Sequence, residues 1–228
     1  MRLSRLRFSS AMLTESPSAR DASARWRDAS NPFASRFVNP SAMRFRNSSV
    51  GPNWDPKALA RSMRERLGST MLIVGPHGSG KTTLLRSALP ELEANFKSVR
   101  SLTIQSGIST WALVRELSCC PRKSLFLIDG AEQLSRWQQT IVLLACRTNG
   151  LVCLATAHEP LSGFETAVRT ETSLELAREL TKELLSGQPD LIVPGLSEID
   201  RLWPKCDDNL RELWSAMYDW YQENYRVA

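Results

Sequence analysis

Short apolar runs alternate with helix-like stretches through the middle of the chain. Five segments have the length and composition of buried strands, namely residues 71–74, 98–104, 124–128, 151–155 and 167–170. Helical patterns lie between and around them, at residues 55–67, 81–89 (further if Pro90 is tolerated), 110–117, 132–146 and 173–185. Strands alternating with helices predict an α/β fold with three α/β/α layers and a parallel sheet, whose ligand lies at the carboxyl ends of the strands.

The strand pattern stops near residue 191, where only helical patterns remain. Helices are predicted over residues 196–203 and 209–225, and Asn209 with Glu212 resembles a capping box. The apolar positions of the last helix share one face and are expected to pack on the core. We therefore predict an α/β core over 55–190, a small helical lid over 191–228, an arm over 31–54 and a disordered extension over 1–30.

Composition narrows the classes of protein without choosing one. The net charge is +5, and much of the positive excess lies in the N-terminal segment, so nucleic-acid binding is permitted but not indicated. No apolar run approaches the length of a membrane span. The five cysteines form no C-x-x-C pair and only two histidines occur, which argues against a zinc site. These features favour a cytoplasmic protein.

The most specific motif is the loop Gly75-Pro76-His77-Gly78-Ser79-Gly80-Lys81-Thr82, followed by Thr83. It fits the phosphate-binding pattern G-x-x-x-x-G-K-[ST], and it stands between a predicted strand and a predicted helix, as the pattern requires. Glycines 75, 78 and 80 are expected to adopt positive φ, so that successive amides face an anion. Lys81 is expected to reach the β- and γ-phosphates, and the Thr82 hydroxyl to ligate Mg²⁺.

A second motif supplies the other half of such a site. The apolar strand that ends in Asp129 is predicted to hold Mg²⁺ opposite Thr82. Many ATPases with such a loop place glutamate directly after this aspartate, but here the position is Gly130. Glu132 is the next acid, and it either orients the attacking water or favours the helix dipole at the start of a helix.

Other residues are candidates for contacts with the γ-phosphate. Thr156 follows a strand and could contact the phosphate or the water, whereas His158 is interpreted as a loop residue. Arg211 could reach the phosphates from the lid or form a surface ion pair. Arg147 and Arg169 are solvated side chains or, if the protein forms rings, arginine fingers for a neighbouring copy.

The order of these motifs resembles the AAA+ and STAND branch of P-loop ATPases over roughly residues 55–225. The resemblance rests on the loop 75–82, on Asp129-Gly130-Ala131-Glu132, on Thr156 and on Asn209-Leu210-Arg211-Glu212. It implies ATP and Mg²⁺ as ligands, with Lys81, Glu132, Thr156 and Arg211 in catalysis. Asp208 departs from the pattern, in which the lid has glycine, and Asn31-Pro32-Phe33 resembles an arm that helps to enclose adenine.

The sequence as a whole favours a Mg²⁺-dependent ATPase that binds ATP. We expect it to bind either another protein or a second copy of itself. An N-K-x-D sequence for guanine is absent, which favours ATP over GTP. The main alternative is an ATP-gated binding module with little turnover, since position 130 is not glutamate. A small-molecule kinase is less favoured, because no arginine-rich cluster lies between the loop and Asp129.

Overall fold

The computed structural model describes residues 31–40, 42–43, 45 and 54–225, so the predicted extension 1–30 lies outside the described residues. The α-helices are α2 (Ser35–Val38), α3 (Pro56–Glu65), α4 (Lys81–Asn95), α5 (Thr110–Ser118), α6 (Arg136–Asn149), α7 (Leu174–Leu184), α8 (Ile192–Leu202) and α9 (Leu210–Asn224). The strands are β1 (Thr70–Val74), β2 (Val99–Thr103), β3 (Leu125–Asp129), β4 (Val152–Ala157) and β5 (Glu165–Arg169). Three short 3₁₀ turns cover Ala131–Gln133, Pro189–Leu191 and Trp203–Lys205.

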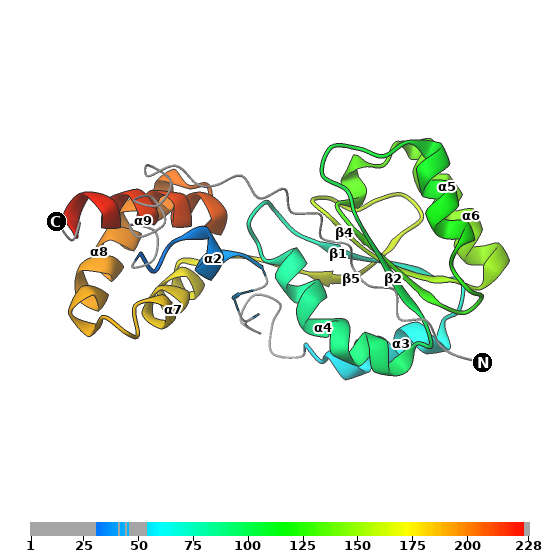
Figure 1. The fold of residues 1–228 in the computed structure, drawn as a ribbon, viewed down its shortest axis with the longest axis horizontal. Coiled ribbons are helices and arrows are strands. Elements are labelled where there is room, and N and C mark those ends of the chain that lie inside the picture. The colour runs from blue at the N-terminus through cyan, green and yellow to red at the C-terminus, as the bar shows by residue number, and fades with distance from the viewer. Residues whose placement is uncertain (1–30, 41, 44, 46–53, 226–228) are drawn as a thin grey trace, which may run out of the picture.

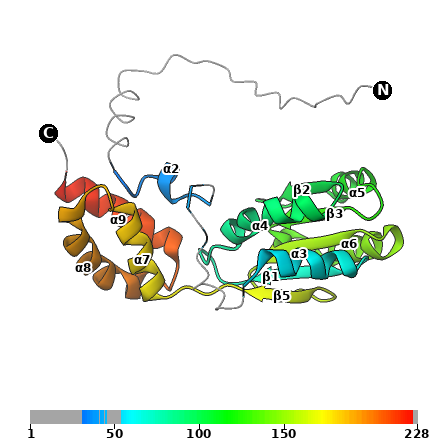
Figure 2. The ribbon, with the colours of Figure 1, turned by 90° about the horizontal axis from the view of Figure 1, so that it is seen from below.

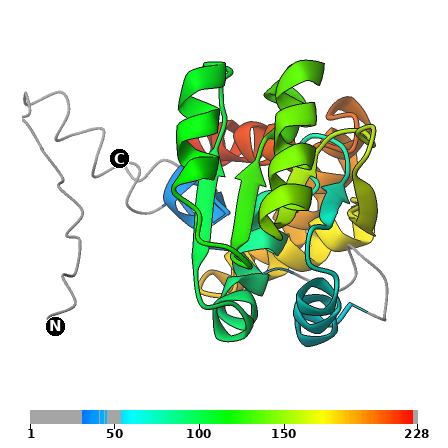
Figure 3. The ribbon, with the colours of Figure 1, turned by 90° about the vertical axis from the view of Figure 1, so that its right-hand side faces the viewer.

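The strands form one parallel sheet in the order β2-β3-β4-β1-β5. The apolar strands β1 and β4 are buried along their whole length, and β3 is buried up to Asp129. Helices α3 and α4 pack on one face of the sheet, and α5 and α6 lie side by side on the other (Figures 1 and 3). The predicted three-layer α/β fold with a parallel sheet is confirmed.

The helical part of the chain has its own apolar core, beside the sheet rather than on it (Figure 2). Helix α7 shares this core with α8 and α9, so the helical cluster begins before residue 191, where the sequence places the lid. Phe33 of the arm also enters it, with its ring stacked on Trp214 at a centroid distance of 6.1 Å. The described part of the arm therefore packs on the helical cluster.

Two helix starts differ from the prediction for local reasons, and α4 takes the longer extent that the sequence left open. Helix α4 continues through Pro90 to Asn95, because Pro90 and Arg86 are exposed and water can reach the carbonyl that the proline leaves unpaired. Helix α6 starts only at Arg136, since Ser135 and Gln138 form a capping box there. Helix α8 starts at Ile192 instead of 196 because its proline, Pro194, lies in the first turn, where a missing N–H costs little.

The topology decides where functional residues meet. Strands β3, β4 and β1 are neighbours, so their carboxyl ends bring the loop after Val74, Asp129 and the residues after Ala157 to one edge of the sheet. The segment after β5 then leads directly into α7 and the helical cluster. In the part of the chain that is described, no helix is both long and apolar enough to span a bilayer.

Candidate functional site

The loop between β1 and α4 has free backbone donors. The N–H groups of residues 77, 78 and 80–83 have no hydrogen-bond acceptor among the described residues. Several of them belong to the first turn of α4, a helix of 15 residues whose positive dipole end therefore lies at this loop. Free amides gathered at a helix N-terminus are suited to an anion. The strand–loop–helix context that the sequence pattern requires is thus present.

The three loop glycines are required for two different reasons. Gly78 and Gly80 have φ values of 71° and 83°, as predicted. Gly75 does not, so the prediction of positive φ is wrong for that residue. It is instead confined by close packing, because a Cβ there would lie 2.5 Å from the backbone oxygen of Thr170 and 2.2 Å from its hydroxyl. Gly75 allows β1, β5 and the loop to approach one another.

The Lys81 ammonium is buried and fully hydrogen-bonded within the protein. Its Nζ donates to the carbonyl oxygens of Gly75 and Pro76, each at 2.7 Å, and to Nδ1 of His158 at 3.1 Å. Burial lowers the pKa of Lys81 to about 8, against the opposing effects of Glu132 and Asp129. The charge of Arg211 lowers it further. A partner with negative charge would reverse this shift and favour the protonated amine.

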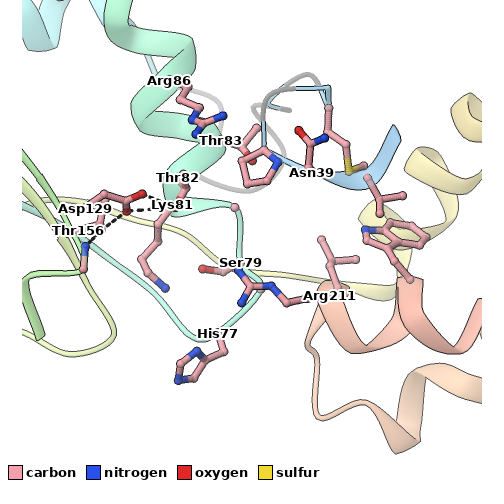
Figure 4. Close-up of a pocket in the computed structure, with 18 of the residues that line it drawn as sticks. Asn39, His77, Ser79, Lys81, Thr82, Thr83, Arg86, Asp129, Thr156 and Arg211 are labelled. Carbon is pink, nitrogen blue, oxygen red and sulfur yellow. Dashed lines mark hydrogen bonds between the residues drawn. The ribbon is translucent and has the colours of Figure 1, made fainter. Parts of the chain in front are cut away.

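Asp129 joins the loop to the neighbouring strand. The Thr82 hydroxyl donates to its two carboxylate oxygens at 3.1 and 3.0 Å, and the Thr156 hydroxyl donates to Oδ1 at 2.7 Å (Figure 4). Thr156 Oγ1 in turn accepts from the Gly130 amide at 2.9 Å. The structure therefore brings Thr82 and Asp129 together, and it engages Thr156 with Asp129. A hydroxyl and a carboxylate at this spacing supply oxygen ligands of the kind that Mg²⁺ prefers.

Glu132 is connected to Lys81 through the side chain of His158, which contacts both residues. Its Oε1 is 3.0 Å from Nε2 of His158, whereas its buried Oε2 has no hydrogen-bond partner in the described structure. The His158 ring packs against the His77 ring, with 3.6 Å between the centroids and an angle of 36° between the ring planes. Burial and the charge of Lys81 lower the pKa of His158, and Glu132 opposes them. A carboxylate with one uncommitted oxygen is available to a polar partner in the site.

Gly130 cannot carry a side chain, which explains why glutamate is absent there. Its φ is 93°, and a Cβ would lie 2.4 Å from the backbone oxygen of Ile104. Ile104 directly follows the adjacent strand β2, so its carbonyl oxygen cannot move away from an added Cβ.

We predict that Gly130→Glu destabilises the fold by about 2–4 kcal/mol and does not raise any activity of the site. Chemical denaturation of the two proteins measures the difference. Gly107→Glu is the matched control, because Gly107 also has positive φ but has open space around its missing Cβ. If Gly130→Glu were no less stable than Gly107→Glu, the close contact with Ile104 would not be the reason for glycine at this position.

A cleft of about 1400 Å³ lies between the sheet edge and the helical cluster. Its polar end contains the loop residues 77–83 with Asp129, Glu132, Thr156 and His158, and its other end is lined by apolar residues of the arm and the helical cluster. Arg211 extends from the start of α9 toward the loop (Figure 4). Gly78 and Asn209 approach closely there, since a Cβ on Gly78 would lie 2.0 Å from Asn209 Oδ1.

Three further sequence positions can now be placed. Arg147 and Arg169 are exposed and lie outside the described lining of the cleft. Asp208, which stands where the resemblance has glycine, has a φ of 56°, so the left-handed backbone that favours glycine is retained.

The sequence analysis missed His158 and Thr170 as site residues. Thr170 accepts or donates a 2.7 Å hydrogen bond with Ser79 and so fixes the loop from β5. His158 contacts both Lys81 and Glu132. Both residues directly follow strands of the parallel sheet at its carboxyl edge, which is the signal that could have identified them.

Comparison with known proteins gives similarity of structure only. No protein-family model and no curated protein matches the chain. Among solved structures, RuvB of Thermotoga maritima, described as a Holliday junction branch migration motor, is similar with a TM-score of 0.45 and 16% identity. NtrX of Brucella abortus, in complex with ATP, gives 0.44 and 15%, and PCH-2 of C. elegans gives 0.37 and 17%. All three are AAA+ P-loop ATPases.

These matches cover 72%, 94% and 61% of this chain, respectively. They span 66%, 60% and 46% of the three known chains, which is less than two thirds of each. At such identities the likeness concerns the arrangement of helices and strands. The function of this chain has to come from its own residues.

Proposed function

We propose that this chain is a Mg²⁺-dependent ATPase of the AAA+ and STAND branch of P-loop ATPases. The observation that carries the proposal is the set of unpaired amides at the start of α4, next to the buried Lys81 ammonium and the Thr82–Asp129 pair. Amides, an ammonium and two oxygen ligands supply the groups needed for a triphosphate and its metal ion. They all lie at the carboxyl edge of a parallel sheet, where ligands of this fold class bind.

Each residue then has a defined role. The amides of residues 77–83 and the Lys81 amine bind the phosphates, with Arg211 approaching from the helical cluster. Thr82 and Asp129 hold Mg²⁺, which when bound neutralises phosphate charge, and Thr156 orients the Asp129 carboxylate. Glu132 accepts a proton from the attacking water or orients it. The free Oε2 of Glu132 supports this assignment, since a buried carboxylate oxygen needs a donor.

The apolar end of the cleft suits a nucleobase. Phe33, Trp214 and Tyr218 line it between the arm and the helical cluster. A purine ring there could be covered by aromatic faces while its phosphates extend to the loop. The arm and the helical cluster would then close on the nucleotide together, because Phe33 is stacked on Trp214.

Substitution of Glu132 by glutamine tests the catalytic part of the proposal. We expect the steady-state turnover of ATP to fall about 100-fold, because an amide cannot take a proton from water, while the affinity for ATP stays unchanged. Glutamine retains an oxygen that can accept from His158, so the fold should be preserved. Phosphate release measures turnover, and calorimetry measures affinity.

Glu171→Gln is the matched control, since Glu171 is exposed and is not among the lining residues of the cleft. Equal turnover in Glu132→Gln and the control would exclude Glu132 as the base. A wild-type protein that binds ATP tightly but hydrolyses it no faster than Glu132→Gln would favour the second candidate, an ATP-gated binding module. That candidate is favoured by one observation, the exclusion of a side chain from position 130.

The lowered pKa of Lys81 predicts a dependence of ATP affinity on pH. The amine loses its proton through a pKa of about 8 in the ligand-free protein, whereas a bound triphosphate holds the proton. Affinity should therefore be constant below pH 8 and fall by up to about tenfold per pH unit above it. In Lys81→Arg, whose guanidinium stays charged, the fall should disappear. Calorimetric titrations between pH 7 and 9.5 make the comparison, and an identical fall in both proteins would assign it to another group.

A further inference from the structure

The Lys81 amine has no donor left for a phosphate. An ammonium group has three N–H donors, and Lys81 directs them at the oxygen of Gly75, the oxygen of Pro76 and Nδ1 of His158. A phosphate oxygen can bind this amine only by displacing one of the three acceptors. The two carbonyls belong to the loop backbone, which is itself held by Ser79 and Thr170. The side chain of His158 is the acceptor that can leave without changing the loop.

A protonated Lys81 amine can only donate, so we assign Nδ1 of His158 as its acceptor, which places the ring proton on Nε2. Nε2 is 3.0 Å from Glu132 Oε1, so the ring donates to the carboxylate. The three side chains form a directed chain in which Lys81 donates to His158 and His158 donates to Glu132. The His77 ring packs against the His158 ring, tilted by 36° at a centroid distance of 3.6 Å.

We propose that His158 is a positioning residue that keeps Lys81 occupied in the ligand-free protein and fixes the Glu132 carboxylate for reaction. This inference rests on the function proposed above. A triphosphate displaces Nδ1 of His158 from Lys81, while the Nε2–H bond to Glu132 Oε1 is retained. Glu132 is thus held by one oxygen and keeps Oε2, which has no partner among the described residues, for the attacking water.

Two opposite effects on kinetics follow from this double role. Removal of the ring nitrogens takes away an acceptor that competes with phosphate, so ATP should bind more tightly. It also takes away the donor that orients Glu132, so the chemical step should slow. A residue that only supports the local fold has no reason to strengthen binding and weaken turnover at once.

His158→Phe tests this in the intact chain, because phenylalanine keeps a ring against His77 but has no nitrogen. The dissociation constant for ATP should fall about fivefold, and kcat should fall about tenfold. His158→Gln is the conservative variant, since its amide carries both an acceptor for Lys81 and a donor for Glu132. It should return both constants toward the wild-type values. It also serves as the second variant if His158→Phe does not fold.

The ring nitrogens can be observed directly. Only two histidines occur, so the variant His77→Gln leaves His158 as the one histidine for ¹⁵N NMR of a labelled sample. In the ligand-free protein, Nε2 should be protonated and Nδ1 unprotonated. A slowly hydrolysed ATP analogue with Mg²⁺ should shift the Nδ1 signal and leave Nε2 protonated.

Several results would overturn the inference. Unchanged binding and turnover in His158→Phe, or a joint loss of both with no recovery in His158→Gln, would contradict it. An Nδ1 signal that does not shift when the ATP analogue and Mg²⁺ are added would also contradict it. If the wild-type protein binds and hydrolyses ATP, any of these outcomes contradicts the inference about His158 but leaves the proposed function intact. A wild-type protein that does not bind ATP would instead remove the proposed function and, with it, this inference.

Discussion

Lys81→Ala should abolish the stabilisation of this protein by ATP. A charge-assisted hydrogen bond to phosphate contributes about 1.5–3 kcal/mol, so we expect the affinity for ATP to fall about 100-fold. Saturation of the wild-type protein at about 100 times the dissociation constant should add about 2.7 kcal/mol to the free energy of unfolding, which corresponds to a Tm increase of roughly 5–11 °C. The variant at the same ATP concentration should show almost none of this increase.

The ligand-free Lys81→Ala protein should be about as stable as the wild type. The substitution removes three hydrogen bonds, but it also removes a buried amine whose pKa is lowered to about 8 by burial. Lys97→Ala, which changes an exposed lysine, is the matched control and should retain the full increase in Tm. A Lys81→Ala protein that ATP stabilises as strongly as the control would refute the assignment of the loop.

Asp129→Asn should remove the dependence of the protein on Mg²⁺. The amide keeps the shape of the side chain and one oxygen that can accept from Thr156, but it has no negative charge for the metal ion. We expect kcat to fall by about 100- to 1000-fold. Affinity for ATP in the variant should be the same with Mg²⁺ and with EDTA, whereas Mg²⁺ should strengthen binding to the wild type.

Asp219→Asn is the control for this substitution, because Asp219 is exposed on α9 and is not a lining residue of the cleft. It should behave as the wild type does with and without the metal ion. Turnover that survives in Asp129→Asn, with an undiminished response to Mg²⁺, would mean that the metal ion is held elsewhere.

The sequence predicted those features that depend on local patterns. Apolar runs identified the buried strands β1, β3 and β4, and their alternation with helices predicted the parallel sheet. The loop motif and the strand ending in Asp129 predicted two groups that the structure places in contact, since Thr82 donates to Asp129. Strands of a parallel sheet end at the same edge, so residues that follow them can be expected to meet.

Contacts between distant segments could not be predicted in this way. The sequence contains no signal that Gly75 is confined by Thr170 or that Gly130 lies against the Ile104 carbonyl, because both constraints come from neighbouring strands. The end of β4 marks the position of His158, but the role of this residue depends on hydrogen bonds to Lys81 and Glu132, which no local pattern reveals. Helix α7 was expected to belong with the α/β core, but it packs in the helical cluster. Amphipathic periodicity shows which face of a helix is buried, but not which element covers that face.

A crystal structure of the protein with Mg²⁺ and a slowly hydrolysed ATP analogue tests the central claim most directly. The account predicts phosphate oxygens on the amides of residues 77–83 and on Lys81, with the metal ion between Thr82 and Asp129 and with Lys81 released from His158. An analogue bound elsewhere, or a loop without phosphate in which Lys81 still donates to Gly75, Pro76 and His158, would contradict it.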